Sequence, residues 1–306
     1  IPRESVAGER RTSATPETVK KMIRLGAEVA IESGAGAAVG FDDSIYAELG
    51  AEIVADRAAL LGSADMVLRL RKPEPDEIGM MKSGCIHVSY LDPFNERDLI
   101  KTLADKGITA ISMEMIPRST RSQKMDALSS QANLAGYVAV MLAAAQLPRI
   151  FPMLMTPAGT LKPAKVFIIG AGVAGLQAIA TAKRLGARVT AFDTRPVVAE
   201  QVQSLGGKFL EIDLGDTGQT SDGYAKELTP EQVEIQRQAQ KDVIADSDVV
   251  ITTAQVFGRK PPVLVTKDMV EGMAPGSVIV DMAAETGGNV EGSVPDETVV
   301  VDGVTI

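Results

Sequence analysis

Short runs of apolar residues alternate along this chain with segments in which apolar residues recur every three to four positions. The runs are typical of buried strands, and the recurring positions are typical of amphipathic helices. Strands that alternate with helices predict parallel sheets covered by helices on their faces. Because the alternation occurs before and after a long alanine-rich stretch, we expect an α/β protein with two domains, mostly parallel sheets and a long joining helix.

The first α/β domain is expected at residues 1–128. Thr15 is a suitable N-cap before Pro16 at the first helical position, and Gly26 is expected to end that helix. The other elements expected here are strands Glu28–Ile31, Met66–Leu70, Ile86–Leu91 and Ile108–Met113 and helices Asp42–Leu49 and Glu96–Lys106.

A joining segment is expected at residues 129–163. From Ser122 to Leu147 the strongest helix breaker is Gly136, which predicts one long alanine-rich helix. The four prolines Pro148, Pro152, Pro157 and Pro163 then predict a loop.

The second domain is expected at residues 164–306. Its expected strands are Val166–Ile169, Arg188–Phe192, Lys208–Glu211, Val249–Thr252, Val278–Met282 and a last one near Val299–Val301, and its expected helices are Ala174–Leu185, Val197–Leu205 and Pro230–Ala245. The segment Asp213–Thr229 is polar and lacks periodicity, which is typical of functional or disordered loops.

The segment Gly170–Gly175 has the pattern GxGxxG between a predicted strand and a predicted helix. In a dinucleotide-binding turn, Gly170 allows the tight bend, Gly172 the close approach of a pyrophosphate, and Gly175 the packing of helix on strand. The helix N-terminus offers free N–H groups and a positive dipole end to the phosphates. Asp193, at the end of the next strand, has the spacing of the carboxylate that binds the adenine ribose. These features predict a Rossmann-like domain that binds NAD(H).

Neighbouring residues complete the expected contacts to the adenosine half of the cofactor. Ala171 and Val173 lie within the turn, and Thr194 and Arg195 follow Asp193. The Asp193 carboxylate would repel a 2′-phosphate, which favours NAD over NADP. Arg195 is able to attract a 2′-phosphate, but Asp193 precedes it and is expected to dominate.

Composition excludes several other kinds of protein. The net charge is −9 and the pI is near 4.9, which argues against a nucleic-acid partner and against attachment to anionic lipid. Cys85 is the single cysteine, so a disulfide framework or a cysteine-based zinc site within the chain is excluded and a reducing cytosolic compartment is favoured. Polar residues and Pro148 interrupt the apolar stretch Ala132–Met155, so no membrane insertion by this chain is expected.

A dehydrogenase that reduces a carbonyl group needs a proton donor beside the hydride acceptor. The single histidine, His87, lies within a predicted strand, where a lone histidine is more often structural. The chain therefore lacks an obvious acid–base group, which favours chemistry that needs none or a binding role.

Several segments resemble the alanine dehydrogenase/transhydrogenase superfamily. The start of the chain does so at Ile1–Glu4, Glu9–Arg11 and Ala14–Pro16. Pro117–Gln131 resembles the Arg–Gln–Asp loop in the NAD(H)-binding domain I of proton-translocating NAD(P) transhydrogenases. The match continues at Asn133–Tyr137, Pro163–Val166, Gly223–Glu227 and Ile251–Ala254, and the resemblance covers the whole chain.

The resemblance implies further cofactor-binding residues. Those of the family loop that flanks the nicotinamide and its ribose are Arg118, Ser119, Thr120, Arg121, Gln123, Asp126 and Ser129. Gly223 and Tyr224 match a loop that closes on bound nucleotide, and Gln236 and Gln255 match positions near the nucleotide. Gln123 and Asp126 are the residues expected to assist hydride transfer, with no acid–base catalyst. At Gln255 this chain departs from the family's Leu-Ile-Pro-Gly, which puts the geometry of that loop in question.

The resemblance also weighs against alanine chemistry. The positions that match the catalytic Lys and His of alanine dehydrogenases are Arg71 and Asp92. An arginine does not titrate usefully, and an aspartic acid is a poor proton donor at neutral pH unless its pKa is raised.

The implied activity is that of a transhydrogenase, in which hydride passes directly between the nicotinamides of NADH and NADP+. By resemblance, NADP(H) is held on a separate domain III, and a membrane domain II translocates the coupled proton. The resemblance also implies a homodimer, active with its partners and located in the cytoplasm, peripheral on the inner membrane. The alternatives are an alanine-dehydrogenase-like amino-acid dehydrogenase and a non-catalytic NAD-sensing module. We expect both ends to be clipped, because the chain starts at Ile1 without a Met and stops at Val304–Ile306 in a predicted strand. By resemblance, the family's domain I continues past Ile306 in a segment that returns to the first domain.

Overall fold

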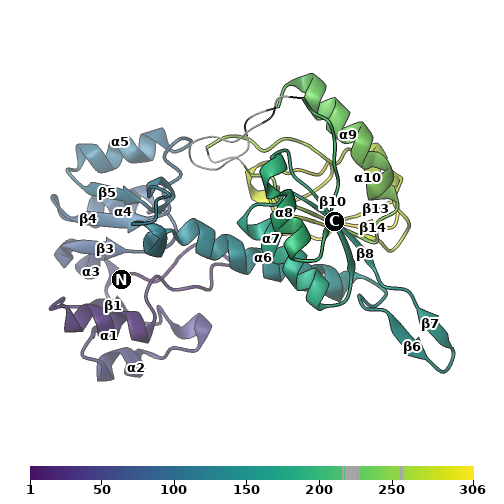
Figure 1. Ribbon diagram of the computed structural model, residues 1–306. Coiled ribbons are helices and arrows are strands. Elements are labelled where there is room, and N and C mark those ends of the chain that lie inside the picture. Colours follow the sequence, from purple (N-terminus) through teal and green to yellow (C-terminus); the bar gives the residue numbers. More distant parts are fainter. Residues whose placement is uncertain (216, 218–225, 227, 256–257) are drawn as a thin grey trace. The chain divides into compact units, whose positions relative to one another are not determined.

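The computed structural model describes residues 1–215, 217, 226, 228–255 and 258–306 (Figure 1). Gly223 and Tyr224, expected in a loop over the nucleotide, lie outside the described residues. The chain divides into two compact units, Ile1–Ala127 and Leu128–Ile306.

The first unit contains two small parallel sheets. One pairs β1 (Ala30–Glu32) with β2 (Glu52–Val54), and the other has the order β3 (Met66–Leu68), β4 (Ile86–Ser89), β5 (Thr109–Ser112). The helices of this unit are α1 (Pro16–Arg24), α2 (Asp43–Glu48), α3 (Arg57–Ser63), α4 (Pro75–Met80) and α5 (Arg97–Asp105).

Local capping explains how the short helices of the first unit begin. The Thr15 hydroxyl accepts a hydrogen bond from the Thr18 N–H at the start of α1, which confirms the predicted N-cap. The sequence pattern does not reveal β2, α3 or α4. Asp56 caps α3, and a reciprocal capping box between Glu74 and Glu77 begins α4. These elements are three to seven residues long, so they are too short to show a hydrophobic period.

The predicted joining helix begins later than expected. Helix α6 spans Ala127–Gln146, whereas the sequence predicts a helix from Ser122. Gln123–Met125 form a separate 3₁₀ turn, and Asp126 has φ −74° and ψ 80°, outside the helical region. The predicted proline-rich loop also contains a hairpin of β6 (Leu154–Thr156) and β7 (Gly159–Leu161), because Pro157 lies in its turn and interrupts neither strand.

The second unit is built on a seven-stranded sheet of order β10-β9-β8-β11-β12-β14-β13. All neighbours are parallel except β13 and β14. The strands are β8 (Lys165–Ile169), β9 (Arg188–Phe192), β10 (Lys208–Phe209), β11 (Val249–Thr252), β12 (Val278–Asp281), β13 (Val300–Val301) and β14 (Val304–Thr305). In order of sequence the six parallel strands read 3-2-1-4-5-6, which is the doubly wound dinucleotide-binding arrangement. The predicted α/β class with mostly parallel sheets is confirmed.

Helices cover both faces of this sheet (Figure 1). Val166 and Ile168 point to one face and join a core with α6, α7 (Val173–Arg184) and α8 (Ala199–Ser204). Phe167 and Ile169 point to the other face and join a core with α9 (Pro230–Ala245) and α10 (Lys267–Glu271). Successive residues of a strand face opposite ways, so a strand buried on both faces is apolar throughout.

One face of α6 is part of this core. Ala139, Val140 and Ala143 are buried in it, and a Cβ built at Gly136 would lie 2.2 Å from the Ala174 carbonyl oxygen. Gly136 therefore permits α6 and α7 to pack closely. By length and composition alone α6 is also long and apolar enough to span a membrane, with 22% of its apolar window buried.

Candidate functional site

The order of strands in the second unit changes direction at β8. The chain runs outward from β8 to β9 and β10, and then crosses to β11 on the other side of β8. Ligands of open parallel sheets bind at such a switch point, outside the carboxyl ends of the strands. The predicted glycine turn Gly170–Gly175 lies there, between β8 and α7.

Steric constraints hold the glycine turn in one shape. Gly170 has φ +100°, a backbone conformation that side chains disfavour. A Cβ at Gly175 would lie 1.8 Å from the Gly170 carbonyl oxygen. The Thr253 hydroxyl, after β11, lies 3.2 Å from the Ile169 carbonyl oxygen and 3.1 Å from that of Gly170, and donates to them. Substitution of these glycines would therefore move the turn.

The turn leads directly into the N-terminus of α7, where phosphate groups would bind. Gly172 is the N-cap of α7 and makes no side-chain cap hydrogen bond, and the first turn carries no acidic residue. A Cβ built at Gly172 meets nothing within 4 Å, so the backbone there is open to a close approach. The first N–H groups and the helix dipole favour an anion at this point.

Asp193 links the turn to the end of β9. One carboxylate oxygen, Oδ2, accepts a hydrogen bond of 2.8 Å from the Ala171 N–H. Arg195 donates to the same carboxylate through its N–H and Nε on Oδ1 and through Nη2 on Oδ2, all at 2.8 Å. These hydrogen bonds to Asp193 raise the pKa of the Arg195 guanidinium. Asp193 thus lies beside the turn, as predicted, but its carboxylate is already hydrogen-bonded to the Arg195 guanidinium.

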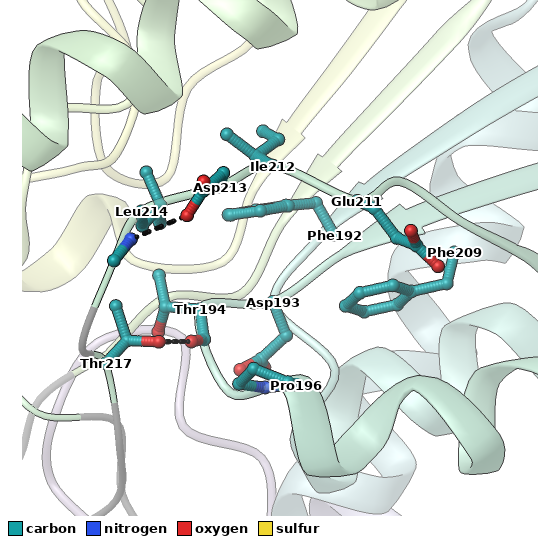
Figure 2. A pocket seen from close by; sticks show the side chains of 11 residues that line it. Phe192, Asp193, Thr194, Pro196, Phe209, Glu211, Ile212, Asp213, Leu214 and Thr217 are labelled. Atoms are coloured by element: carbon teal, nitrogen blue, oxygen red, sulfur yellow. Dashed lines mark hydrogen bonds between the residues drawn. The ribbon is translucent and has the colours of Figure 1, made fainter.

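A cavity of about 320 Å³ opens beside Asp193 at the ends of β9 and β10 (Figure 2). Its lining residues are Phe192, Asp193, Thr194, Pro196, Phe209, Glu211, Ile212, Asp213, Leu214, Gly215 and Thr217. Its walls combine apolar side chains with the carboxylates of Asp193, Glu211 and Asp213. Of these residues the sequence predicts Asp193 and Thr194 as cofactor contacts. Ligands bind at the carboxyl ends of the strands in such sheets. This rule, applied to β10, would have predicted the residues from Glu211 onward as well.

The remaining predicted site residues are distributed over both units. Exposed residues of the first unit are Arg118, Ser119, Thr120, Arg121 and Gln123, whereas Asp126 is half-buried. Ser129 is half-buried on α6 in the second unit.

Two predicted glutamines and one turn residue are in different surroundings. Gln236 on α9 is 2% exposed, and its Oε1 has no hydrogen-bond partner among the described residues. Gln255 is exposed, and its side chain donates to the Met282 carbonyl oxygen at 2.8 Å. Val173 is 40% exposed at the first position of α7. Their contacts with a nucleotide stay predictions.

Family models match nearly the whole chain. The model described as "Alanine dehydrogenase/PNT, N-terminal domain" matches residues 1–135, and "Alanine dehydrogenase/PNT, C-terminal domain" matches residues 139–306. The chain belongs to the alanine dehydrogenase/PNT family.

Relatives within the alanine dehydrogenase/PNT family carry two kinds of name. The chain is 46% identical to an NAD(P) transhydrogenase subunit alpha protein of Rhodospirillum rubrum, over 100% of this chain and 82% of that protein. It is 45% identical to NAD(P) transhydrogenase subunit alpha of Cereibacter sphaeroides, over 100% of this chain and 59% of that protein. It is 33% identical to alanine dehydrogenase of Bacillus subtilis, over 95% of this chain and 71% of that protein.

Among solved structures of the alanine dehydrogenase/PNT family, a transhydrogenase is again more similar to this chain than an alanine dehydrogenase is. A transhydrogenase from Sinorhizobium meliloti has a TM-score of 0.88 at 44% identity, and covers 99% of this chain and 83% of its own. An L-alanine dehydrogenase has a TM-score of 0.81 at 29% identity, over 99% and 80%.

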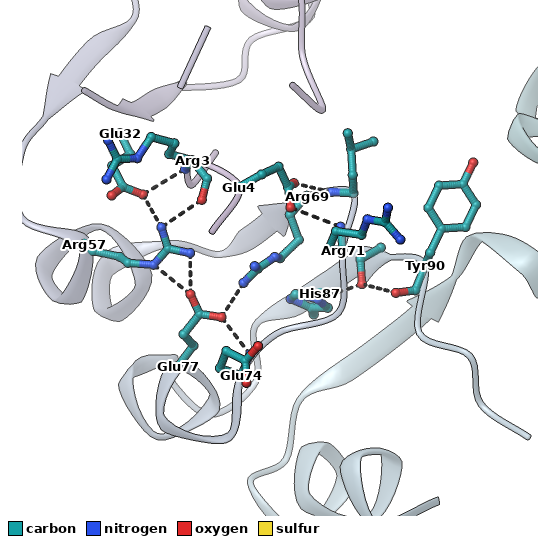
Figure 3. Close-up of polar contacts among 12 residues, drawn as sticks. Arg3, Glu4, Glu32, Arg57, Arg69, Arg71, Glu74, Glu77, His87 and Tyr90 are labelled. Carbon is teal, nitrogen blue, oxygen red and sulfur yellow. Dashed lines mark hydrogen bonds and ion pairs between the residues drawn. The ribbon is translucent and has the colours of Figure 1, made fainter. Parts of the chain in front are cut away.

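Within the alanine dehydrogenase/PNT family, a proton donor in the first unit would favour alanine chemistry. His87 is fully buried, and its Nε2 lies 3.1 Å from the Ser89 hydroxyl (Figure 3). Burial, aided by the charge of Arg69, lowers the pKa of His87 to about 4. Such an imidazole is neutral at pH 7 and does not reach solvent, which agrees with the structural role expected for it.

The two positions that match the alanine-dehydrogenase catalysts are engaged within the protein. Arg71 Nε donates to Glu9 at 2.9 Å, and Arg11 donates to the same carboxylate. Asp92 accepts two hydrogen bonds from the Asn95 amide, at 2.9 and 3.1 Å. No group of three or more metal-ligating side chains occurs among the described residues.

Proposed function

We propose that this chain is the NAD(H)-binding component of a proton-translocating NAD(P) transhydrogenase. In this role it passes hydride between NADH and NADP+ held on a partner domain, and a membrane component couples the transfer to proton translocation. The observation that carries the proposal is the dinucleotide turn with Asp193, together with a first unit whose only histidine is buried and neutral. The names of the relatives at 43–46% identity support it.

The residues of the second unit fit NAD(H) in three parts. The N-terminus of α7 at Gly172 would bind the pyrophosphate, since backbone N–H groups point there. Asp193 would accept hydrogen bonds from the adenine ribose, and the cavity beside it would hold the adenosine. Bound NADH supplies the hydride from its nicotinamide ring.

We further propose that the family loop assists at the nicotinamide end. Gln123 is exposed and offers an amide donor and acceptor to a ribose or a carboxamide. Asp126, Ser129 and the exposed Arg118 complete the set that the family pattern implies. The task of these residues is to position and to exclude water, because a direct hydride transfer moves no proton.

The acidic chain needs partners for the complete reaction. We propose an NADP(H)-binding domain III and a membrane domain II, with this chain on the cytoplasmic side and held peripherally on the inner membrane by them. The net charge of −9 favours recruitment by a protein partner over anionic lipid.

We also propose a homodimer through the second unit. Apolar side chains more than one-third exposed gather on α6, on the β6–β7 hairpin and at the residue before it. They are Leu134, Tyr137, Val138, Met141, Leu142, Met153, Leu154, Met155 and Leu161. Such a surface exceeds the scattered apolar residues of a monomer. Analytical ultracentrifugation should give twice the chain mass, and Met155→Asp with Leu142→Asp should give a monomer; a wild-type monomer would refute the dimer.

A reconstituted assay tests the transhydrogenase proposal. The chain should quench or shift NADH fluorescence alone, without turnover, and should form NADPH or a thio-NADPH analogue once an NADP-binding domain is added. Absence of transfer, with NADH binding confirmed, would refute it and leave an NAD-sensing module.

The alanine-dehydrogenase alternative has its own observation, the 33% identity to the Bacillus subtilis enzyme. The Glu9 carboxylate, however, occupies Arg11 and Arg71, and Arg71 stands where the catalytic lysine is expected. We expect no alanine-dependent reduction of NAD+ by this chain, which an absorbance assay of NADH formation would measure.

A further inference from the structure

We propose that the Arg195 guanidinium is a replaceable partner of Asp193, which it leaves when an adenosine ribose binds, and that this competition limits the preference of the site for NAD(H) over NADP(H). The inference rests on the proposed NAD(H) site and does not depend on the proposed hydride acceptor.

Four hydrogen-bond donors already surround the Asp193 carboxylate. Two are backbone groups, the Ala171 N–H on Oδ2 and the Arg195 N–H on Oδ1, each at 2.8 Å. Two belong to the guanidinium, Nε on Oδ1 and Nη2 on Oδ2, again at 2.8 Å. A carboxylate offers about four acceptor positions. A ribose hydroxyl can therefore reach Asp193 only by replacing one of these donors.

The two kinds of donor differ in how easily they are replaced. The Ala171 N–H belongs to the turn that Thr253 holds, and the Arg195 N–H to the chain directly after β9, so neither leaves without a change in the backbone. The guanidinium is carried on a flexible side chain and needs only a change of rotamer. The 2′- and 3′-hydroxyls of a ribose bring two O–H donors, which is the number that the guanidinium withdraws.

The exchange treats the two dinucleotides differently because they differ in charge. A ribose diol adds no charge beside Asp193, so it gains nothing from Arg195 and competes with it. A 2′-phosphate adds negative charge beside Asp193, and Glu211 and Asp213 line the same cavity. Arg195 is the cation paired with Asp193 and would offset part of that repulsion. Arg195 thus opposes the diol and favours the phosphate.

Removal of the guanidinium should consequently move the two affinities in opposite directions. We would titrate the full chain with NADH and, separately, with NADPH, using nucleotide fluorescence at one fixed ionic strength. Arg195→Ala should bind NADH about threefold to tenfold more tightly and NADPH severalfold more weakly. Arg188→Ala is the matched control, because Arg188 is exposed at the opposite end of the same strand and should leave both affinities unchanged.

The other outcomes are each decisive. If NADH and NADPH weaken together in Arg195→Ala, Arg195 has a structural or common binding role and the exchange is wrong. It is also wrong if NADH affinity is unchanged while NADPH affinity falls. An unaltered circular dichroism spectrum and melting temperature would establish that the variant is folded, and Arg195→Lys, which keeps the charge but loses the bidentate contact, should lie between the two. A wild-type chain that binds no NADH would overturn the proposed function itself.

Discussion

Two carboxylates, one in each unit, are held by an arginine two residues later in the same geometry. In the first unit, Glu9 accepts the N–H and Nε of Arg11 on Oε1, at 3.1 and 2.8 Å, and Nη2 on Oε2 at 2.6 Å. In the second, Asp193 accepts the N–H, Nε and Nη2 of Arg195 in the same pattern. The two places differ in the fourth donor, which is the guanidinium of Arg71 at Glu9 and the N–H of Ala171 at Asp193.

The fourth donor decides what each pair is able to do. Glu9 joins two cations, so a ligand that displaced either would leave a charge without its partner. The hydrogen bond and charge of Arg11, aided by Arg71, lower the pKa of Glu9 to about 2. At Asp193 the fourth donor is a neutral backbone group of the glycine turn, and the carboxylate lines a cavity. The same local motif therefore leaves Glu9 fully occupied by two arginines, whereas the Asp193 carboxylate remains accessible to a ligand in the cavity.

The largest expected effect comes from the turn on which Asp193 depends. Gly175→Ala would place a Cβ 1.8 Å from the Gly170 carbonyl oxygen, so the turn must move. We expect NADH affinity to fall at least about 100-fold and the melting temperature to drop, as overpacking costs about 1–3 kcal/mol or more. Gly172→Ala, whose Cβ meets no protein atom within 4 Å, should keep its melting temperature and lose NADH affinity alone. Equal loss of stability in both variants would contradict the comparison.

The next effect separates the two carboxylates directly. Asp193→Ala removes the ribose acceptor, and charge-assisted hydrogen bonds contribute about 1.5–3 kcal/mol, so NADH affinity should fall about tenfold or more. Glu9→Ala leaves Arg11 and Arg71 without that carboxylate and should lower stability while NADH affinity stays within about twofold. Isothermal titration and urea unfolding would measure the two quantities. A tenfold loss of NADH affinity in Glu9→Ala would assign the first unit a part in binding this nucleotide.

The free energy of unfolding should depend on pH through His87, which lies in the first unit. The folded pKa of His87 is about 4, whereas an unfolded histidine has about 6.5. The unfolded state binds more protons between these values, so stability is complete above pH 6.5 and is lost as the pH falls towards 4. The loss between about pH 7 and about pH 5 should be about 2 kcal/mol. Urea unfolding followed by circular dichroism should show that His87→Gln reduces this difference; an identical pH dependence in both proteins would be the contrary result.

The smallest effect concerns the hydroxyl that holds the turn. Thr253→Val removes the hydrogen bonds to the Ile169 and Gly170 carbonyl oxygens and keeps the shape of the side chain. A single hydrogen bond contributes about 1 kcal/mol, so NADH affinity should fall about fivefold. Thr156→Val, which loses a comparable bond of 2.9 Å to the Gly159 carbonyl oxygen in the β6–β7 hairpin, is the matched control. Equal NADH affinity in the two variants would show that Thr253 does not set the turn.

Much of the second unit was predictable because its signals are local. Strand Arg188–Phe192, helix Pro230–Ala245 and strand Val249–Thr252 have the predicted bounds. The two strands are rich in apolar residues, and the Thr229–Gln232 capping box marks the start of the helix. The glycine pattern likewise predicts a turn between a strand and a helix.

The sequence-based predictions fail where helices and strands are short, and where proline is compatible with both a loop and the end of a strand. The helix α10, at Lys267–Glu271, and the strands of the hairpin are too short to carry a period of their own. Prolines at Pro152 and Pro157 indicate a continuous loop in the sequence, yet the strands β6 and β7 lie after the first and on both sides of the second. The strand propensity of a residue does not include the contacts that neighbouring strands make with it, and these contacts stabilise short strands.

By itself the sequence determined the class of fold, the glycine turn and the acidic residue that follows the second strand, since these depend on neighbours in the chain. Only the tertiary structure decided what meets Asp193. The distance between Asp193 and Ala171, the wall that Glu211 and Asp213 contribute, and the second arginine on Glu9 all join residues that are far apart in the chain or on different elements. Spacing alone makes Glu9–Arg11 and Asp193–Arg195 equivalent, because a charged pair two residues apart has the same local geometry in both. Packing distinguishes them, since it places a second cation beside one carboxylate and a cavity beside the other.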